Sequence, residues 1–183
     1  EVFDRDVAQS PEFQAQLGIK TEDYGRWGDY SDAFAQMQDR QAAADLKRLH
    51  GEFDFDALDV ESRLSYRIFE YMQQRALSNF KWRFHNYAIS QMDDVASSLP
   101  VFLQNVHKIE TRADAEAYIS RLQGVDTVMR EVVNHLRAGE SIGVIPPMMV
   151  YPRVLPGALD MLKGAPFEEA AADGILLADF RGK

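Results

Sequence analysis

A serine between two glycines is the residue in this chain that most resembles a catalytic nucleophile. Residues 139–143 (GESIG) fit the pattern G-x-S-x-G, which in hydrolases holds the serine on a sharp turn between a strand and a helix. That arrangement also needs a histidine later in the chain, but all four histidines precede Ser141, and a helical pattern leads into it. We interpret the motif as a helix end followed by a turn, and we assign no catalytic residue to this chain.

The spacing of possible metal ligands argues against a metal site in the sequence. No H-E-x-x-H occurs, and no two histidines lie within five residues of each other, so a helix cannot present a zinc-binding pair. There is no cysteine, which excludes disulfides and thiolate ligands. Asp54, Asp56 and Asp59 are interpreted as turn and helix-capping residues, because Leu58 stands where a calcium loop needs a ligand. We therefore predict no metal and no cofactor within these residues.

Residues 80–87 (FKWRFHNY) interleave aromatic and basic side chains, as single-strand nucleic-acid binders do. On a helix, however, Phe80, Phe84 and Tyr87 share one face that Lys81 and Arg83 do not flank. The net charge of −9 also disfavours phosphate-rich partners, which need clustered lysine and arginine. We interpret the stretch as core packing, and the alternative is a cleft wall that contacts a peptide or a sugar.

The composition is that of a globular protein. The 183 residues are 46% hydrophobic and 27% charged, and a chain of this length can bury a core of its own. No apolar run approaches the roughly twenty residues of a membrane span. We expect one helical domain over residues 1–183. A cell-envelope or periplasmic location is compatible with the sequence, because an upstream signal is not visible here, and a cytoplasmic one is not excluded.

Helical periodicity runs through the sequence, and no stretch alternates with period two. The longest pattern without proline or glycine extends from Val60 to Gln91, with apolar residues three or four apart and Asp59 as the expected N-cap. A helix of that length would span roughly 45 Å. The predicted fold class is therefore all-α: a multi-helix bundle or array around this long helix.

Residue types that favour helix ends mark the other expected helices. The expected starts are Ser10, Ser31, Pro100 and Thr111. The expected ends are Gly18, Gly51 and Gly139. Thr111 and Asp114 have the spacing of a capping box, and the helix that they open is expected to loosen near Gly124.

The last part of the chain, residues 140–183, is predicted to be broken by prolines. Pro152 and Pro156 interrupt a helical composition, so this segment should be kinked or split. Residues 174–180 are strongly apolar, yet the sequence stops three residues later. We expect Lys183 to be a cut rather than a natural terminus, and we expect residues 140–183 to pack against a missing part.

Several short sequence motifs, in their order and spacing, resemble those of the bacterial domain-of-unknown-function family number 885. They are residues 10–12 (SPE), 17–18 (LG), 29–31 (DYS), 64–66 (LSY), 86–87 (NY) with Gln91, 99–100 (LP), 111–122 (TRADAEAYISRL) and 139–147 (GESIGVIPP). The resemblance covers almost the whole chain, and residues 111–122 and 139–147 carry it best.

The resemblance implies a role that the composition does not show. Family members are longer, largely helical, often envelope-associated proteins or lipoproteins, and they resemble zinc metallopeptidases of the oligopeptidase type. Their metal motif lies well beyond the matched region. The resemblance thus implies that this chain is a non-catalytic N-terminal wall of a substrate cleft, with zinc in the full-length protein. Tyr151, Arg153 and Gln91 are the candidates for contact with substrate.

A different class of function is the alternative. A free-standing helical module without enzymatic activity would hold a partner helix or peptide in its apolar grooves. The expected partners are therefore the remainder of the same polypeptide or a peptide, and neither nucleic acid nor a membrane is expected. The apolar residues 174–180 separate the two hypotheses, because a module must cover them within its own chain.

Overall fold

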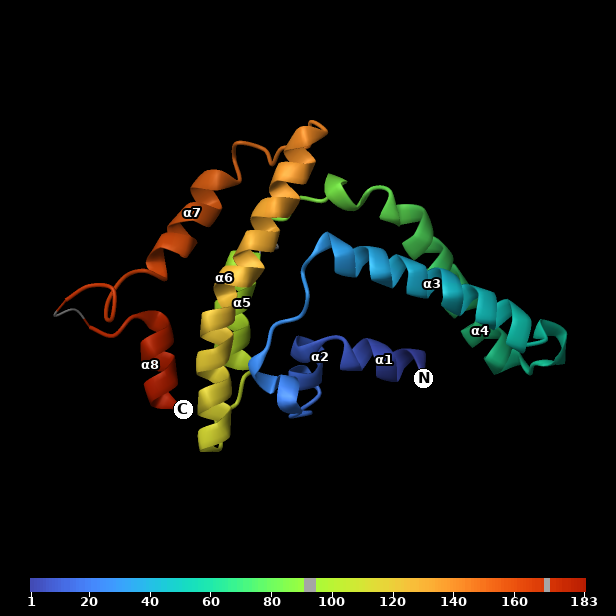
Figure 1. Ribbon diagram of the computed structural model, residues 1–183, viewed down its shortest axis with the longest axis horizontal. Helices are drawn as coiled ribbons and strands as arrows, with labels where there is room; N and C mark the ends of the chain where they lie inside the picture. The colour runs from blue at the N-terminus through green and yellow to red at the C-terminus, as the bar shows by residue number, and fades with distance from the viewer. Residues whose placement is uncertain (91–94, 170–171) are drawn as a thin grey trace. The chain divides into compact units, whose positions relative to one another are not determined.

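The computed structural model describes residues 1–90, 95–169 and 172–183, and these residues form a helical array (Figure 1). The α-helices are α1 (Val2–Ala8), α2 (Pro11–Gln16), α3 (Asp32–Glu52), α4 (Val60–Phe80), α5 (Val95–Asn105), α6 (Arg112–Ser141), α7 (Tyr151–Asp160) and α8 (Ile175–Gly182). Short 3-10 turns span Glu22–Gly25, Phe55–Ala57 and Arg83–His85. No strand occurs in the described residues, so the all-α prediction is confirmed.

The chain divides into two compact units. Unit 1 comprises Glu1, Phe3–Asp29 and Tyr87–Lys183, and unit 2 comprises Val2 and Tyr30–Asn86.

The longest helix of unit 1 is α6, with 30 residues. Its start is the predicted capping box: the Thr111 hydroxyl accepts a hydrogen bond from the Asp114 amide, and the Asp114 carboxylate accepts one from the Thr111 amide. The predicted loosening near Gly124 was wrong, because α6 runs through it unbroken. The Trp27 ring lies against this glycine, only 3.0 Å from where a Cβ would stand, so the missing side chain makes room for the indole.

The core of unit 1 is formed by α2, the first 3-10 turn, α5 and α6. Its members are Ala15, Tyr24 and Phe102, with Trp27, Val106 and Ala117 packed against them. The prediction that Pro100 starts α5 was wrong, because the helix already begins at Val95. An interior proline costs about 3 kcal/mol, and the burial of Leu99 and Leu103 on either side of it offsets that cost.

The proline-rich end of unit 1 contains two short helices, α7 and α8. The predicted interruption at Pro152 and Pro156 does not occur, because α7 runs through both prolines. Pro152 lies in the first turn of α7, where its missing amide costs nothing, while Pro156 lies inside the helix. Gly143 and Gly164 have positive φ in the loops before and after α7, a conformation that favours glycine. The final helix, α8, contacts α5, and its Phe180 ring lies 5.3 Å from the Tyr118 ring of α6.

Unit 2 is a hairpin of two 21-residue helices, α3 and α4. Ser31 and Asp59 cap them as predicted, each accepting a hydrogen bond from an amide three residues on. The prediction that this helix ends at Gly51 was off by one residue, because α3 ends at Glu52. Within the hairpin, Ala42 and Asp45 of α3 are buried, while no residue of α4 is.

The predicted helix from Val60 to Gln91 was too long, because α4 ends at Phe80. The Arg83 guanidinium lies 4.4 Å from the ring centroids of both Phe80 and Phe84 and forms an ion pair with Asp32 of α3 at 2.6 Å. These contacts hold residues 83–85 in a 3-10 turn. They depend on a helix that lies far away in sequence, so helical periodicity did not reveal them. The expected shared face of Phe80, Phe84 and Tyr87 is therefore absent.

Candidate functional site

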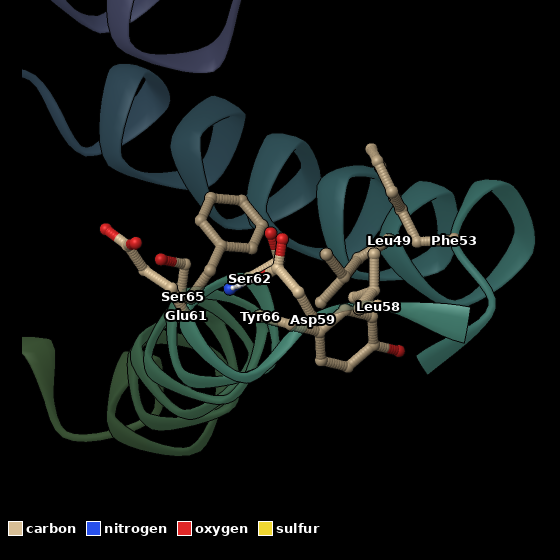
Figure 2. Close-up of a pocket in the computed structure, with 9 residues that line it drawn as sticks. Leu49, Phe53, Leu58, Asp59, Glu61, Ser62, Ser65 and Tyr66 are labelled. Atoms are coloured by element: carbon tan, nitrogen blue, oxygen red, sulfur yellow. Dashed lines mark hydrogen bonds between the residues drawn. The ribbon is translucent and has the colours of Figure 1, made fainter. Parts of the chain in front are cut away.

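A hollow of unit 2 lies at the closed end of the α3–α4 hairpin (Figure 2). It is an open groove of about 450 Å³. Its lining residues come from the end of α3, the connecting turn and the first turns of α4: Leu49, Phe53, Leu58, Asp59, Glu61, Ser62, Ser65, Tyr66 and Phe69. Leu49 and Leu58 lie beside the Tyr66 ring, so the floor near the turn is apolar. We call this hollow the hairpin groove.

One side of the hairpin groove carries oxygen atoms. The Asp59 carboxylate accepts a hydrogen bond from the Ser62 amide at 2.7 Å, and this backbone bond lowers the pKa of Asp59 below its usual range. Glu61 and the hydroxyls of Ser62 and Ser65 add further acceptors. Carboxylates beside an apolar floor suit a cation attached to an aliphatic or aromatic body.

Aromatic and charged side chains brace the turn next to the groove. The Phe55 ring packs edge-on against Tyr66, with centroids 5.3 Å apart. Arg63 and Arg67 place their guanidinium groups 5.5 and 5.0 Å from the centre of the Phe55 ring. Arg63 also donates a hydrogen bond to the Phe55 carbonyl at 3.1 Å. These contacts fix the shape of the turn beside the groove.

Unit 1 contains a fully buried arginine on α6. The Arg121 Nε donates to the Tyr24 carbonyl at 2.7 Å, and its guanidinium lies 4.9 Å from the centroid of the Trp27 ring and 4.6 Å from that of the Phe102 ring. A second, longer hydrogen bond reaches the Pro11 carbonyl at 3.4 Å. The indole nitrogen of Trp27 in turn donates to the Arg121 carbonyl at 2.7 Å. Arg121 therefore ties the N-terminal turns to α6, which is a structural role.

A nearby carboxylate, Asp114, is also buried, and it accepts several hydrogen bonds. Burial by itself would raise its pKa, but hydrogen bonds from Lys20 and from the Glu110 and Thr111 amides outweigh this effect and lower the pKa of Asp114 to about 2. Hydrogen bonds to Glu110 and then Asp114 raise the pKa of Lys20 above its usual range. Asp114 is thus ionised at neutral pH and anchors the start of α6.

His107 is enclosed by aromatic rings. Its ring stacks on Tyr24 at 4.5 Å and meets the edge of Tyr118 at 5.3 Å, while Nε2 lies 3.0 Å from the Asp114 carbonyl. The Nδ1 atom has no hydrogen-bond partner among the described residues. Burial, and then the charges of Arg121 and Lys183, lower the pKa of His107. A buried imidazole that contacts two aromatic rings supports a packing role.

The structure describes three of the residues singled out in the sequence: Tyr151, Arg153 and Ser141. Tyr151 and Arg153 lie in the first turn of α7, and both are exposed. Gln91 falls outside the described residues. Ser141 is the last residue of α6, and its hydroxyl donates to the Ala138 carbonyl at 2.7 Å, so the G-x-S-x-G match is a helix end as interpreted.

The residues that the structure describes do not fit a zinc site. No group of three or more His, Asp or Glu side chains gathers among them in an arrangement that could hold a metal ion. Among the same residues, no helix combines the length and the apolarity that crossing a membrane requires.

Sequence reasoning missed both the hairpin groove and the buried cluster around Arg121. The groove depends on how two helices meet, which periodicity does not give. Arg121 had a readable signal: it lies three residues after Tyr118 and seven before Val128, in phase with the buried positions of α6. A charge in phase with the core stripe of a helix indicates a buried ion.

Comparison with known proteins places the chain in a family. No curated protein and no solved structure gives a match. The family described as "Bacterial protein of unknown function (DUF885)" matches residues 11–182. The match runs from the first residue of α2 to the end of α8, which includes the capping box of α6, the Arg121 cluster and the hairpin groove. This chain therefore belongs to the DUF885 family of bacterial proteins.

Proposed function

We propose that this chain is the non-catalytic helical part of a zinc-metallopeptidase-like protein and forms a wall of its substrate cleft. The metal motif lies outside residues 1–183 in this proposal, and the remainder of the same polypeptide is the main partner. The family membership and the exposed apolar face of α7 support it. A cell-envelope location is proposed with it, and cell fractionation tests that part.

The observation that carries the proposal is the apolar face of α7. Leu155 and Leu159 are four residues apart on one face, and more than half of each side chain is exposed. Met148 and Met149, just before the helix, are also exposed. Contiguous apolar side chains of this kind mark a surface that another part of a protein covers. A cleft wall needs such a surface, one side of which meets the catalytic part.

Tyr151 and Arg153 take different places in this arrangement. Tyr151 lies four residues before Leu155 and shares its face, whereas Arg153, two residues after Tyr151, points about 200° away around the helix. One cleft therefore contacts one of them. The proposal favours Tyr151, because a phenol at the edge of an apolar face can pack on a substrate and also donate a hydrogen bond.

The first test is to read the gene beyond the codon for Lys183. An open frame with a His-Glu pair and a later histidine supports the proposal, and a stop codon within a few residues contradicts it. In the longer protein, Tyr151→Ala is expected to raise KM for a peptide substrate about fivefold with little change in kcat. Tyr30→Ala, also at an exposed tyrosine, is the matched control. Peptide hydrolysis by the 183-residue chain in the presence of a chelator would overturn the proposal.

The second candidate function is a non-enzymatic binding module, and the hairpin groove favours it. The groove joins an apolar floor to Asp59 and Glu61, so it suits a segment that combines a lysine or arginine with an apolar residue. Its test is binding of a small panel of amphipathic cationic peptides, followed by calorimetry. Glu61→Gln should weaken binding severalfold, and Glu116→Gln on α6 should not. Equal effects of the two variants would exclude the groove as the site.

A further inference from the structure

Helix α4 carries apolar side chains on two opposite faces. One face is half-buried and lies toward α3: Tyr66, Phe69, Leu77 and Phe80. The other face exposes at least half of each of its side chains: Val60, Leu64, Ile68, Tyr71 and Met72. We call these five residues the outer face of α4. A helix that is apolar on both sides is typical of helices packed on both sides.

The outer face is a narrow ridge. Leu64, Ile68 and Met72 are successive members of an i, i+4 row, which is the ridge that most often packs into the groove of another helix. Phe69 follows Ile68 by one residue and is therefore turned about 100° away, toward α3. The ridge is thus separate from the packing that holds the hairpin together.

The sequence of α4 is symmetric about Ile68. Leu64 and Met72 lie four residues before and after it, and Glu61 and Arg75 lie seven residues before and after it. Both charged side chains are on the same side of the helix as the ridge, because seven residues are close to two full turns. Neither Glu61 nor Arg75 has an ion-pair partner among the described residues.

This symmetry selects one way for two copies to meet. If two α4 helices pair antiparallel with a two-fold axis at Ile68, Leu64 faces the partner's Met72 and Glu61 faces the partner's Arg75. The two-fold axis generates a second, identical contact between Glu61 and Arg75. Two opposite-charge contacts therefore flank an apolar centre. Parallel pairing would set Glu61 against the same residue of the other copy, and this like-charge contact is unfavourable.

We propose that α4 is a dimerisation helix whose outer face binds the outer face of a second copy of this chain, antiparallel and centred on Ile68. The proposal is independent of the proposed cleft. The contact is one helix wide and smaller than the roughly 800 Å² per partner of a standard interface. The dimer should therefore dissociate on dilution.

Sedimentation equilibrium of the 183-residue chain, from micromolar to submillimolar concentration, tests the association. Ile68→Glu is expected to weaken dimerisation at least tenfold, because it places two like charges at the axis. Its matched control is Ile119→Glu on α6, a side chain exposed to a similar extent, which should leave the dimerisation constant unchanged. Circular dichroism of both variants checks that the helices are retained.

Charge reversal tests the pairing itself. Glu61→Arg and Arg75→Glu should each weaken the dimer severalfold, because each creates like-charge contacts. The double variant E61R/R75E restores opposite charges and should recover the original association. Recovery of this kind is not expected if the single variants act only by disturbing the hairpin.

Cross-linking tests the register, since the chain has no cysteine of its own. Ile68→Cys should form a disulfide between copies on mild oxidation. Leu64→Cys alone should not, because its two copies would lie about 12 Å apart along the axis, but it should cross-link when mixed with Met72→Cys. The proposal is overturned by a monomer at every concentration, by a dimer that Ile68→Glu leaves unchanged, or by efficient cross-linking of Leu64→Cys alone.

Discussion

At the scale of single residues, unit 1 depends on polar groups in its interior. Arg121 is held by two backbone carbonyls and two aromatic faces, all from segments more than fifteen residues away in sequence. Removing one side of such an arrangement leaves buried carbonyls without donors, which costs more than the hydrogen bonds contribute. Two substitutions probe this interior.

Arg121→Leu is expected to destabilise the protein by about 3 kcal/mol, since the Tyr24 and Pro11 carbonyls lose their donor while the apolar volume is kept. Urea unfolding followed by circular dichroism measures the change. The matched control is Arg112→Leu on the same helix, where an exposed ion pair with Glu116 contributes less than about 1 kcal/mol. Similar losses in the two variants would contradict the structural role of Arg121.

His107 makes stability depend on pH. Burial lowers its pKa in the folded state below the usual 6.5, so the unfolded chain takes up a proton first as the pH falls. Above about pH 6.5, neutral His107 makes its full contribution to the free energy of unfolding. This contribution is lost as the pH falls toward the lowered pKa, by at most about 1.4 kcal/mol per pH unit. Nearby Arg121 and Lys183 act in the same direction, and Asp114 opposes them.

The measurement is the free energy of unfolding in urea between pH 7 and pH 5. In His107→Gln, the amide can still donate to the Asp114 carbonyl, and the pH dependence in this window should become flatter. The control is His85→Gln, at an exposed histidine in unit 2, which should keep the slope of the unaltered protein. A slope that His107→Gln leaves unchanged would assign the pH dependence to other groups.

At the scale of elements, helix starts follow local rules while helix ends follow tertiary contacts. Four of the N-caps are Ser10, Ser31, Asp59 and Thr111, and each accepts a hydrogen bond from an amide three residues on. The end of α4 at Phe80 is set instead by the contacts of Arg83 with Asp32 and with two phenylalanine rings.

The capping box of α6 is expected to contribute about 1 kcal/mol. Thr111→Ala removes the acceptor of the Asp114 amide and should destabilise unit 1 by that amount. Thr127→Ala, at an exposed position in the middle of the same helix, is the control and should be neutral or slightly stabilising, because alanine is the better helix former. Thermal unfolding compares the two. An equal loss in both would mean that the cap has no specific role.

At the scale of the molecule, the two units differ in how many side chains their helices bury. In unit 1, α6 contributes buried Tyr118, Val128 and Val132 to a shared core, whereas the hairpin of unit 2 buries only Ala42 and Asp45 among its helical residues. Local stability follows buried apolar contact. The units should therefore open at different free energies.

Hydrogen exchange followed by mass spectrometry should show this difference in dilute solution. Amides of α3 and α4 are expected to exchange at least tenfold faster than those at the centre of α6, because fewer side chains must separate to expose them. Val132→Ala should accelerate exchange in α6 and leave α3 unaffected. Uniform protection across the two units would show that they open together.

The sequence by itself determined the all-α class, the starts of four helices and the family resemblance. Each of these depends on neighbours within a few residues, where propensity, capping and periodicity act. Only the tertiary structure decided where α4 ends, that α5 continues through Pro100, and that Arg121 is buried. The same holds for the hairpin groove and the outer face of α4. These features depend on contacts between segments far apart in the chain, where burial outweighs local preference.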